Sequence, residues 1–336
     1  MKIAIRTEGG KGIGFGHIMR CLSLYYELEK RGAKPFFIVN SDESVLGQFK
    51  NVIKHFTFDW QNAYERTSEL VKGIDVLVID SYKMKAEEYI GLSKMVKLLV
   101  CLDDFNRINY PSGIVLNGSV CARKFSYPEK EDIIYLLGSE YAFLRREFCK
   151  PYDRIIKKDI NNVLITFGGD DANNSTPRIM ELLLNNFDCT LNVVIGWGFI
   201  NTDYMDEYKN NKKVRFIFKP GAEAMRDLML SCDIAISAGG QTTFELAVTG
   251  TPAIGICVAD NQEMNLKGWS EVGFMKYAGW YNDSRFLENV KNCFDELRSQ
   301  QIRKEASEIG KKYVDGIGSS RVATQILEKF DKTTCN

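Results

Sequence analysis

Both halves of the 336-residue chain begin with the same order of features: a short apolar run, a loop that carries glycines, and a segment with helical spacing. The first half reads MKIAIR, TEGGKGIGFG and HIMRCL, and the second reads NVLITF, GGDDANNST and PRIMELL. A strand that leads through a loop into a helix is the building unit of parallel sheets covered by helices. The chain is therefore predicted to be an α/β protein with two Rossmann-like parallel-sheet domains that face an interdomain cleft.

Short runs rich in Ile, Val, Leu and Phe recur between longer mixed segments, which is typical of alternating strands and helices. Helical spacing is visible at His17 to Arg31, at Lys85 to Met95, and in an amphipathic segment from Ser319 to Phe330. The expected strands are Lys2 to Arg6, Pro35 to Val39, Asp75 to Ile79, Lys97 to Leu102, Gly113 to Leu116, Ile133 to Leu136, Asn162 to Phe167, Thr190 to Ile195, Val214 to Phe218, Asp233 to Ser237 and Pro252 to Cys257.

The two expected domains are separated by a segment with no clear periodicity. Glu147 to Asn161 is polar and basic and carries Pro151, which is typical of a linker. At about 150 residues per domain, the chain length also favours two domains. We expect an N-terminal domain at 1–151 and a C-terminal domain at 152–336.

Charge and cysteine usage narrow the classes of partner. Lys plus Arg and Asp plus Glu both number 44, so no net field attracts nucleic acid. The nine cysteines form no C-x-x-C pair, so neither a disulfide framework nor a zinc site is indicated. No segment reaches the roughly 18 apolar residues of a membrane span, and no export signal is visible. We expect a cytoplasmic protein without membrane insertion, metal or cofactor.

The loop from Thr7 to His17, TEGGKGIGFGH, holds five glycines between a strand and a helix, and includes Gly14 and Gly16. Bare backbone N–H groups at a helix start suit an anion such as phosphate. The loop does not match the dinucleotide-binding fingerprint, because no glycine stands at the third position of that motif. It does not match the Walker loop either, because Lys and Ser/Thr are missing where that motif requires them. The glycines serve either an anion or close packing of the strand against the helix.

His17 is one of only two histidines in the chain, and it stands in the first turn of the expected helix. The positive end of the helix dipole disfavours protonation there, so a neutral imidazole is available to accept a proton. The alternative is a histidine bonded to nearby backbone. His55, in VIKHFTF, has the setting of an ordinary strand residue.

A second glycine-bearing segment, Ser237 to Val248 (SAGGQTTFELAV), follows an expected strand. Its backbone N–H groups and hydroxyls suit the oxygens of a diphosphate, and Glu245, one turn into the helix, suits the hydroxyls of a ribose. The alternative is a helix cap with Glu245 stabilising the dipole. The candidate diphosphate residues are Gly239, Gly240, Gln241 and Thr242.

Two more loops follow strands of the second half. Asn261 and Gln262 carry amides that suit sugar hydroxyls, although for either residue taken alone a plain polar loop is the preferred interpretation. Gly168 and Gly169 would allow a nucleotide to approach the backbone closely. The adjacent pairs Asp103–Asp104 and Asp170–Asp171 suggest magnesium only weakly, because no further ligands complete a shell.

Several motifs occur in the order found in a known family. They are IGFGHIMRCLSL, IDSYKM, LDDF, GSEYAFLRREF, ITFGGDD, SAGGQTTFELA and ADNQ, and they cover almost the whole chain. The chain resembles the UDP-2,4-diacetamido-2,4,6-trideoxy-β-L-altropyranose hydrolases of pseudaminic acid biosynthesis and related spore-coat polysaccharide proteins. The GFGH-x-x-R motif is specific to this group, whereas the GG and E signatures are shared with the lipid II N-acetylglucosaminyltransferase.

This resemblance implies a GT-B fold in which the second domain holds UDP and the first supplies the reactive histidine. It implies hydrolysis of the anomeric carbon–oxygen bond with inversion, without metal, to release UDP and a free 6-deoxy sugar. The family's catalytic histidine corresponds to His17. Four substrate-binding candidates fall in matching segments: Arg20, Tyr82, Asn117 and Tyr141.

Three alternatives remain at this point. An inverting GT-B glycosyltransferase would use His17 to deprotonate a sugar or lipid hydroxyl. A non-catalytic nucleotide-sugar binding protein would have His17 turned into the fold. An NAD-dependent oxidoreductase would use Asp42 for the ribose, but the failed fingerprint disfavours it. We expect a monomer with a UDP-sugar as its partner.

Overall fold

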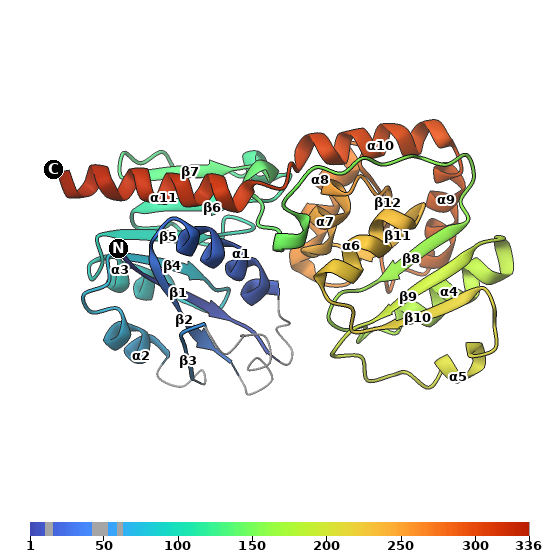
Figure 1. Ribbon diagram of the computed structural model, residues 1–336, viewed down its shortest axis with the longest axis horizontal. Coiled ribbons are helices and arrows are strands. Elements are labelled where there is room, and N and C mark those ends of the chain that lie inside the picture. The colour runs from blue at the N-terminus through green and yellow to red at the C-terminus, as the bar shows by residue number, and fades with distance from the viewer. Residues whose placement is uncertain (11–15, 42–52, 59–62, 336) are drawn as a thin grey trace. The chain divides into compact units, whose positions relative to one another are not determined.

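The computed structural model describes residues 1–10, 16–41, 53–58 and 63–335. Two units are distinguished by their internal contacts (Figure 1). The first unit consists of Met1–Arg146 together with Ile317–Asn336, and the second consists of Glu147–Gly316.

In the described part of the first unit, seven parallel strands form one sheet in the order β3-β2-β1-β4-β5-β6-β7. This is a Rossmann-like order, with its switch point between β1 and β4. The strands are β1 Lys2–Glu8, β2 Lys34–Asn40, β3 His55–Phe58, β4 Val76–Asp80, β5 Leu98–Leu102, β6 Gly113–Asn117 and β7 Ile133–Leu137.

Alternating side chains of the central strands bury both faces of this sheet. Ile3 and Ile5 of β1 lie in one apolar cluster, whereas Ala4 between them lies in another on the opposite face. Val76 and Leu77 of β4 divide in the same way. Burial on both faces explains why these strands are nearly continuous apolar runs. The covering helices are α1 Gly16–Lys30, α2 Ala63–Leu70, α3 Ala86–Ser93 and α11 Gly318–Cys335.

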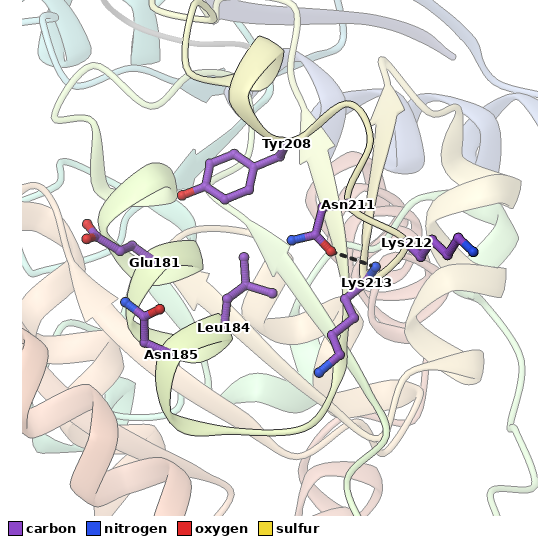
Figure 2. A pocket seen from close by; sticks show the side chains of 7 residues that line it. All are labelled: Glu181, Leu184, Asn185, Tyr208, Asn211, Lys212 and Lys213. Atoms are coloured by element: carbon purple, nitrogen blue, oxygen red, sulfur yellow. Dashed lines mark hydrogen bonds between the residues drawn. The ribbon is translucent and has the colours of Figure 1, made fainter.

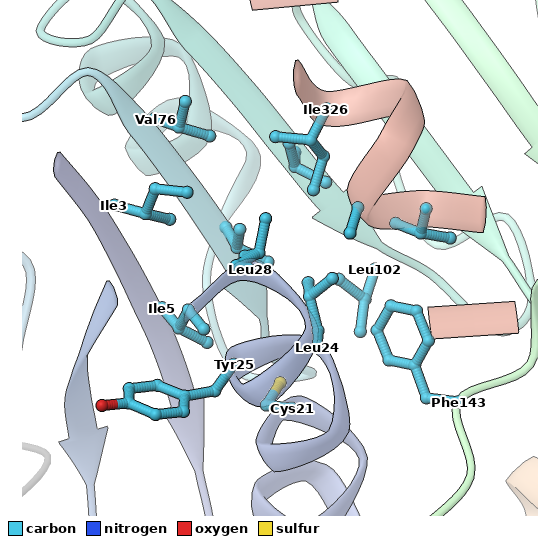
Figure 3. Close-up of a cluster of buried hydrophobic side chains, with 14 of the residues drawn as sticks. Ile3, Ile5, Cys21, Leu24, Tyr25, Leu28, Val76, Leu102, Phe143 and Ile326 are labelled. Atoms are coloured by element: carbon cyan, nitrogen blue, oxygen red, sulfur yellow. The ribbon is translucent and has the colours of Figure 1, made fainter. Parts of the chain in front are cut away.

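The C-terminal helix α11 packs against the first unit, and this corrects the expected extent of the second domain, which included it. Ile326 lies in the same apolar cluster as Leu24 and Leu28 of α1 (Figure 3). The Ser23 and Ser319 hydroxyls are hydrogen-bonded at 2.6 Å. The amphipathic pattern of this segment predicted a helix, but the pattern contains no information about which sheet the apolar face covers.

The described second unit holds six parallel strands in the order β10-β9-β8-β11-β12-β13, so its switch point lies between β8 and β11. The strands are β8 Asn162–Thr166, β9 Thr190–Ile195, β10 Val214–Phe218, β11 Ile234–Ala238, β12 Ala253–Cys257 and β13 Met275–Trp280. The helices are α4 Ser175–Asn186, α5 Met205–Tyr208, α6 Ala222–Ser231, α7 Thr242–Val248, α8 Asp260–Glu271, α9 Phe286–Leu297 and α10 Gln300–Tyr313.

The edge strand β13 is missing from the expected strands. In its sequence, MKYAGW, only Met275 and Ala278 are buried and the other four positions are half-buried, and Gly279 has a φ of 89°, so no continuous apolar run marks it. The expected linker also differs, because it is irregular yet anchored to the second unit. The Arg154 guanidinium donates to the Met229 carbonyl at 2.8 Å and to the Thr251 hydroxyl at 2.9 Å.

Short 3-10 helices complete the described structure at η2 Ala122–Lys124, η3 Ser139–Tyr141 and η4 Arg146–Phe148. Among the helices of the described ranges, none is both long enough and apolar enough to span a bilayer.

Candidate active site

The carboxyl ends of strands β1, β4 and β5 gather polar side chains at the switch point of the first sheet. Glu8 ends β1, Asp80 ends β4, and Asp103 and Asp104 directly follow β5. Ligands of open parallel sheets bind beyond this edge, where the strand order reverses. A ligand of the first unit is therefore expected to bind at this edge.

His17 lies at the start of α1 and is hydrogen-bonded to Asp80. The His17 Nδ1 and Asp80 Oδ1 atoms are 2.7 Å apart, and Asp80 is 0% exposed. An ionised carboxylate only accepts hydrogen bonds, so Nδ1 carries a proton, and in the neutral form of the imidazole Nε2 is then the acceptor. A carboxylate that orients an imidazole in this way is the arrangement found around general bases.

Arg20, one turn after His17, links two carboxylates. Its Nε and Nη2 atoms donate to the two oxygens of Asp80 at 2.6 Å each. Its Nη1 and Nη2 atoms donate to Asp104 at 2.9 and 3.0 Å. In this structure the guanidinium expected to bind substrate is thus engaged by protein carboxylates, and it holds Asp80 in place beneath His17.

The Arg20 guanidinium keeps both carboxylates ionised. Burial by itself would raise the pKa of Asp80, but Arg20 and His17 lower the pKa well below its ordinary value. The pKa of Asp104 is also lowered, because the charge of Arg20 outweighs the effect of burial.

Tyr82 follows β4 and lies against His17. The ring centroids are 4.4 Å apart with the planes at 84°, an edge-to-face contact. The Tyr82 hydroxyl donates to Asp104. Burial and the Asp104 carboxylate raise the pKa of Tyr82 well above its usual range, so the hydroxyl keeps its proton and remains a donor.

Asn117, at the end of β6, is 0% exposed and bonded within the fold. Its Nδ2 atom donates to the Tyr127 hydroxyl at 3.0 Å, and its Oδ1 atom accepts from the Ser119 backbone at 2.9 Å. The structure therefore places Asn117 as a residue that orders the loop after β6 rather than as an exposed amide. Tyr141, in η3, is half-buried against the core of the first unit.

Of the loop glycines expected beside His17, Gly16 is exposed at the first position of α1, with open space around it. Gly14 lies outside the described residues. Asp42, the ribose ligand of the oxidoreductase alternative, also lies outside them.

In the second unit, the loops after β11 and β12 are joined by Gln262. Its Oε1 atom accepts from the Gly239 backbone at 3.1 Å and from the Val258 backbone at 3.3 Å. An added Cβ at Gly239 would lie 2.6 Å from Leu266, so this position has no space for a side chain. The Gly239 N–H expected for a diphosphate is therefore used within the protein, whereas Gly240 borders open space.

The other residues of this group lie around the start of α7 and α8. Gln241 and Thr242 are half-buried at the start of α7, and Asn261 is exposed in the first turn of α8. Glu245 is only 3% exposed. These residues share the carboxyl edge of β11 and β12, as expected for the ends of neighbouring parallel strands.

Gly168 and Gly169 follow β8 and are exposed, with open space at both positions. Gly168 has a φ of 80°, which favours glycine. The neighbouring Asp171 caps α4, because its carboxylate accepts from the Ser175 and Thr176 backbone N–H groups at 3.0 and 2.7 Å. Asp171 thus has a structural role, and within the described ranges no group of three or more His, Cys, Asp or Glu residues is placed to hold a metal.

A depression of about 540 Å³ lies elsewhere on the second unit (Figure 2). It is bordered by α4 and by the segment that leads into β10, with Tyr208 and Lys213 among its lining residues. Because Lys213 directly precedes β10, the depression lies toward the amino edge of the sheet. It contains none of the residues singled out from the sequence.

His17 was singled out by its position in the sequence, and Arg20 and Tyr82 by the family resemblance, and the structure brings the three together. Asp80 was missed as the partner of both His17 and Arg20. The sequence feature that could have identified Asp80 is its position as the acidic residue at the end of the apolar run VLVID. Asp104 was considered only as a weak metal ligand, and Glu8 was not considered.

Comparison with solved structures defines the class of fold. The chain matches MurG of Acinetobacter baumannii with a TM-score of 0.67 and 14% identity, over 98% of this chain and 100% of that chain. It matches the Staphylococcus aureus MnaA structure determined with UDP with a TM-score of 0.65 and 12% identity, over 98% and 97% of the two chains. The protein has the GT-B fold of two parallel-sheet α/β units, as predicted.

Sequence relatives confirm the resemblance read from the motifs. An uncharacterised protein of Methanocaldococcus jannaschii is 31% identical over 76% of this chain and 55% of its own length. The pseudaminic acid cytidylyltransferase and UDP-2,4-diacetamido-2,4,6-trideoxy-β-L-altropyranose hydrolase of Helicobacter pylori is 27% identical over 83% of this chain and 48% of its own length. The spore coat polysaccharide biosynthesis protein SpsG of Bacillus subtilis is 22% identical over 99% of both chains.

The chain is therefore a homologue of the pseudaminic acid hydrolase and of the spore-coat protein. It spans about half the length of the first two of these relatives. No family model matches the chain.

Proposed function

We propose that the chain hydrolyses a UDP-linked diacetamido-trideoxy sugar at the anomeric carbon–oxygen bond, with inversion, in the biosynthesis of pseudaminic acid or a surface polysaccharide. The observation that carries this proposal is the hydrogen bond between His17 and the buried Asp80. Relatives and fold together support the coarser statement, an enzyme of the nucleotide-sugar or glycosyl-transfer kind. Hydrolysis and its substrate are the finer part of the proposal, supported by the name of the Helicobacter pylori relative.

In the proposed reaction, His17 Nε2 takes a proton from a water molecule. The water oxygen forms a bond to the anomeric carbon on the face opposite UDP, and the bond from that carbon to the diphosphate oxygen breaks. The electron pair leaves with UDP, and the products are UDP and the free sugar of inverted configuration. A general base contributes about 10²- to 10⁴-fold to the rate.

Asp80 has two parts in this scheme: it fixes the tautomer that leaves Nε2 unprotonated, and it lies beside the imidazolium that forms. UDP is a good leaving group once donors stabilise its developing charge, so the second carboxylic acid of ordinary glycosidases is dispensable. The proposed donors and sugar ligands of the second unit are Gly168, Gly169, Gly240, Gln241, Thr242, Glu245, Asn261 and Gln262.

One rival is an inverting GT-B glycosyltransferase, in which the hydroxyl of an acceptor replaces water. A Campylobacter hominis protein whose name gives an N-acetylglucosamine transferase is 24% identical over 98% of both chains, and this favours the rival specifically. A second rival is a nucleotide-sugar binding protein without turnover. It is favoured by the burial of His17, whose side chain is only 9% exposed.

The deciding experiment incubates the protein with UDP-linked diacetamido-trideoxy sugars and with UDP-N-acetylglucosamine, without acceptor, and follows nucleotide and sugar by NMR. The wild-type chain is expected to release UDP and an initially inverted sugar. His17→Ala is expected to lower turnover by about two orders of magnitude or more with UDP affinity nearly intact. His55→Ala is the matched control, because His55 begins strand β3 and its ring is hydrogen-bonded to the Ile53 carbonyl at 2.9 Å rather than to the Asp80 carboxylate.

Each rival gives a different result. UDP release that requires an added sugar or lipid acceptor identifies the transferase. Saturable binding of a UDP-sugar with no UDP release identifies the binding protein. Full turnover by His17→Ala removes His17 from the reaction and with it the proposed mechanism.

A further inference from the structure

Glu8 is a buried carboxylate at the end of β1, with 1% of its surface exposed. It accepts hydrogen bonds from the start of the loop that follows β4. The Tyr82 backbone N–H donates to Glu8 Oε1 at 2.7 Å, and the Ser81 hydroxyl donates to Glu8 Oε2. The buried Arg6 guanidinium lies 3.4 Å from the same carboxylate.

Ser81 extends this anchoring into the loop. Its oxygen accepts from the Lys83 and Met84 backbone N–H groups at 3.2 and 3.0 Å. Glu8 and Ser81 therefore fix the backbone from residue 81 to residue 84 by bonds that a buried carboxylate strengthens. Charge-assisted bonds to backbone N–H groups are among the stronger ones in a folded chain.

The residue anchored in this way, Tyr82, contacts His17. Tyr82 is held at its backbone by Glu8 and at its hydroxyl by Asp104, and its ring meets the imidazole at 4.4 Å. Two fixed ends allow the ring little freedom to move. The position of the Tyr82 ring in turn limits the rotation of the imidazole about the bond to Asp80.

We propose that Glu8 is a positioning residue that holds the Tyr82 ring against His17 and so keeps the imidazole aligned for the reaction. This inference rests on the function proposed above. Glu8 touches neither the imidazole nor any atom assigned to the substrate, and it acts through Tyr82. A displacement of about 1 Å at a reacting centre is enough to cost 10²-fold in rate, so an indirect role of this kind is measurable.

The test is a double-mutant cycle on UDP release. In Glu8→Gln, the amide presents N–H groups toward Arg6 or Ser81, where the carboxylate accepted, so the loop loses part of its anchor. We expect kcat to fall roughly 10- to 100-fold with KM within about twofold of wild type. In a Tyr82→Ala background, Glu8→Gln is expected to have almost no further effect, because the ring through which it acts is gone.

Asp75→Asn is the matched control. Asp75 accepts from the Lys2 backbone at 2.9 Å and pairs with Lys97 at the opposite edge of the same sheet. Its replacement is expected to leave kcat unchanged. Ser81→Ala removes the hydroxyl that donates a hydrogen bond to Glu8, and it is expected to give a smaller loss of kcat. The test therefore does not depend on the folding of Glu8→Gln alone.

A second measurement is independent of turnover. Hydrogen exchange of the Tyr82 amide is expected to accelerate in Glu8→Gln, while the amides of β1 and β4 keep their protection. Losses from Glu8→Gln and Tyr82→Ala that multiply would overturn the inference, and so would an unchanged exchange rate at Tyr82. A wild-type chain that releases no UDP refutes the proposed function instead, and the exchange measurement then decides alone whether Glu8 holds Tyr82.

Discussion

Replacing Asp80 by Asn changes one charge at the centre of the candidate site with almost no change in shape. Asp80 Oδ1 accepts from His17 Nδ1 and Arg20 Nη2, and Oδ2 accepts from Arg20 Nε. An amide has one oxygen and one NH₂ group, so only one side continues to accept. If the NH₂ group faces His17, it forces the proton of the imidazole onto Nε2, where the base must be unprotonated.

Two magnitudes follow from this geometry. The wrong tautomer and the loss of the charge beside the imidazolium remove the contribution of the base, so kcat is expected to fall by about 10²- to 10⁴-fold. Arg20 keeps its bonds to Asp104 at 2.9 and 3.0 Å, so the buried cation retains one partner. The loss of stability is therefore about 1.5–3 kcal/mol, the range of one charged hydrogen bond.

The stability difference has a definite pH dependence. The folded-state pKa of Asp80 is lowered, so its contribution is fully present above the ordinary pKa of about 3.9 and is lost as the pH falls through the folded value. Urea unfolding is expected to show a constant gap between wild type and Asp80→Asn from about pH 5 to pH 7. The gap is expected to shrink below about pH 4.

The assay compares UDP release, UDP affinity and unfolding for Asp80→Asn and for Asp233→Asn. Asp233 is also a buried carboxylate and directly precedes β11, where it accepts from the Asn161 and Asn162 backbone N–H groups at 2.9 and 2.8 Å. Its variant is expected to lose stability without loss of kcat. Wild-type turnover in Asp80→Asn would refute the assignment of the His17–Asp80 pair, and so would a stability gap that widens at low pH.

Two further predictions concern the second unit and the first sheet. Glu245→Ala is expected to weaken UDP binding about 10- to 100-fold, the value of one charged hydrogen bond, and calorimetry that finds unchanged affinity would remove Glu245 from the site. Gly113→Ala is expected to lower the melting temperature severely, because φ is 94° and a Cβ would lie 2.0 Å from the Leu99 carbonyl. Gly32→Ala, at φ 81° with open space, is the control, and an equal loss in the two variants would show that the close contact at Gly113 is not the cause.

The strands of both sheets were largely predictable from sequence because burial on both faces requires continuous apolar runs. Strand β13 was missed because it lacks this burial on both faces. β13 is half-exposed at an edge, and its apolar residues are interrupted. The attachment of α11 could not be predicted, since an amphipathic face is compatible with either sheet until Val322 and Ile326 are seen in the core of the first unit.

In the candidate site, single residues could be predicted from the sequence, but their partners could not. His17 stood out because histidine is rare in this chain and a helix start is a special position. Its partner Asp80 is 63 residues away, and Asp104 is 84 residues from Arg20. Such pairs depend on which strand ends are neighbours in the sheet, and the order of strands is not a local property of the sequence. Asn117 illustrates the converse, since the family resemblance identified the residue but not its burial.

The charges of the cluster explain why Asp104 is not redundant beside Asp80. The pKa values of both carboxylates are lowered, so with Arg20 they leave one net negative charge beside the His17 ring. The proton that His17 accepts in the proposed reaction brings the cluster to neutrality in a largely buried setting, where an uncompensated charge of either sign is costly. With Asp80 alone, Arg20 would already balance the carboxylate, and the imidazolium would be left as an unpaired charge. The Asp104 carboxylate therefore compensates the charge that His17 gains when it takes up a proton in the proposed reaction. The hydrogen bond that Asp104 accepts from the Tyr82 hydroxyl keeps the neighbouring ring in place.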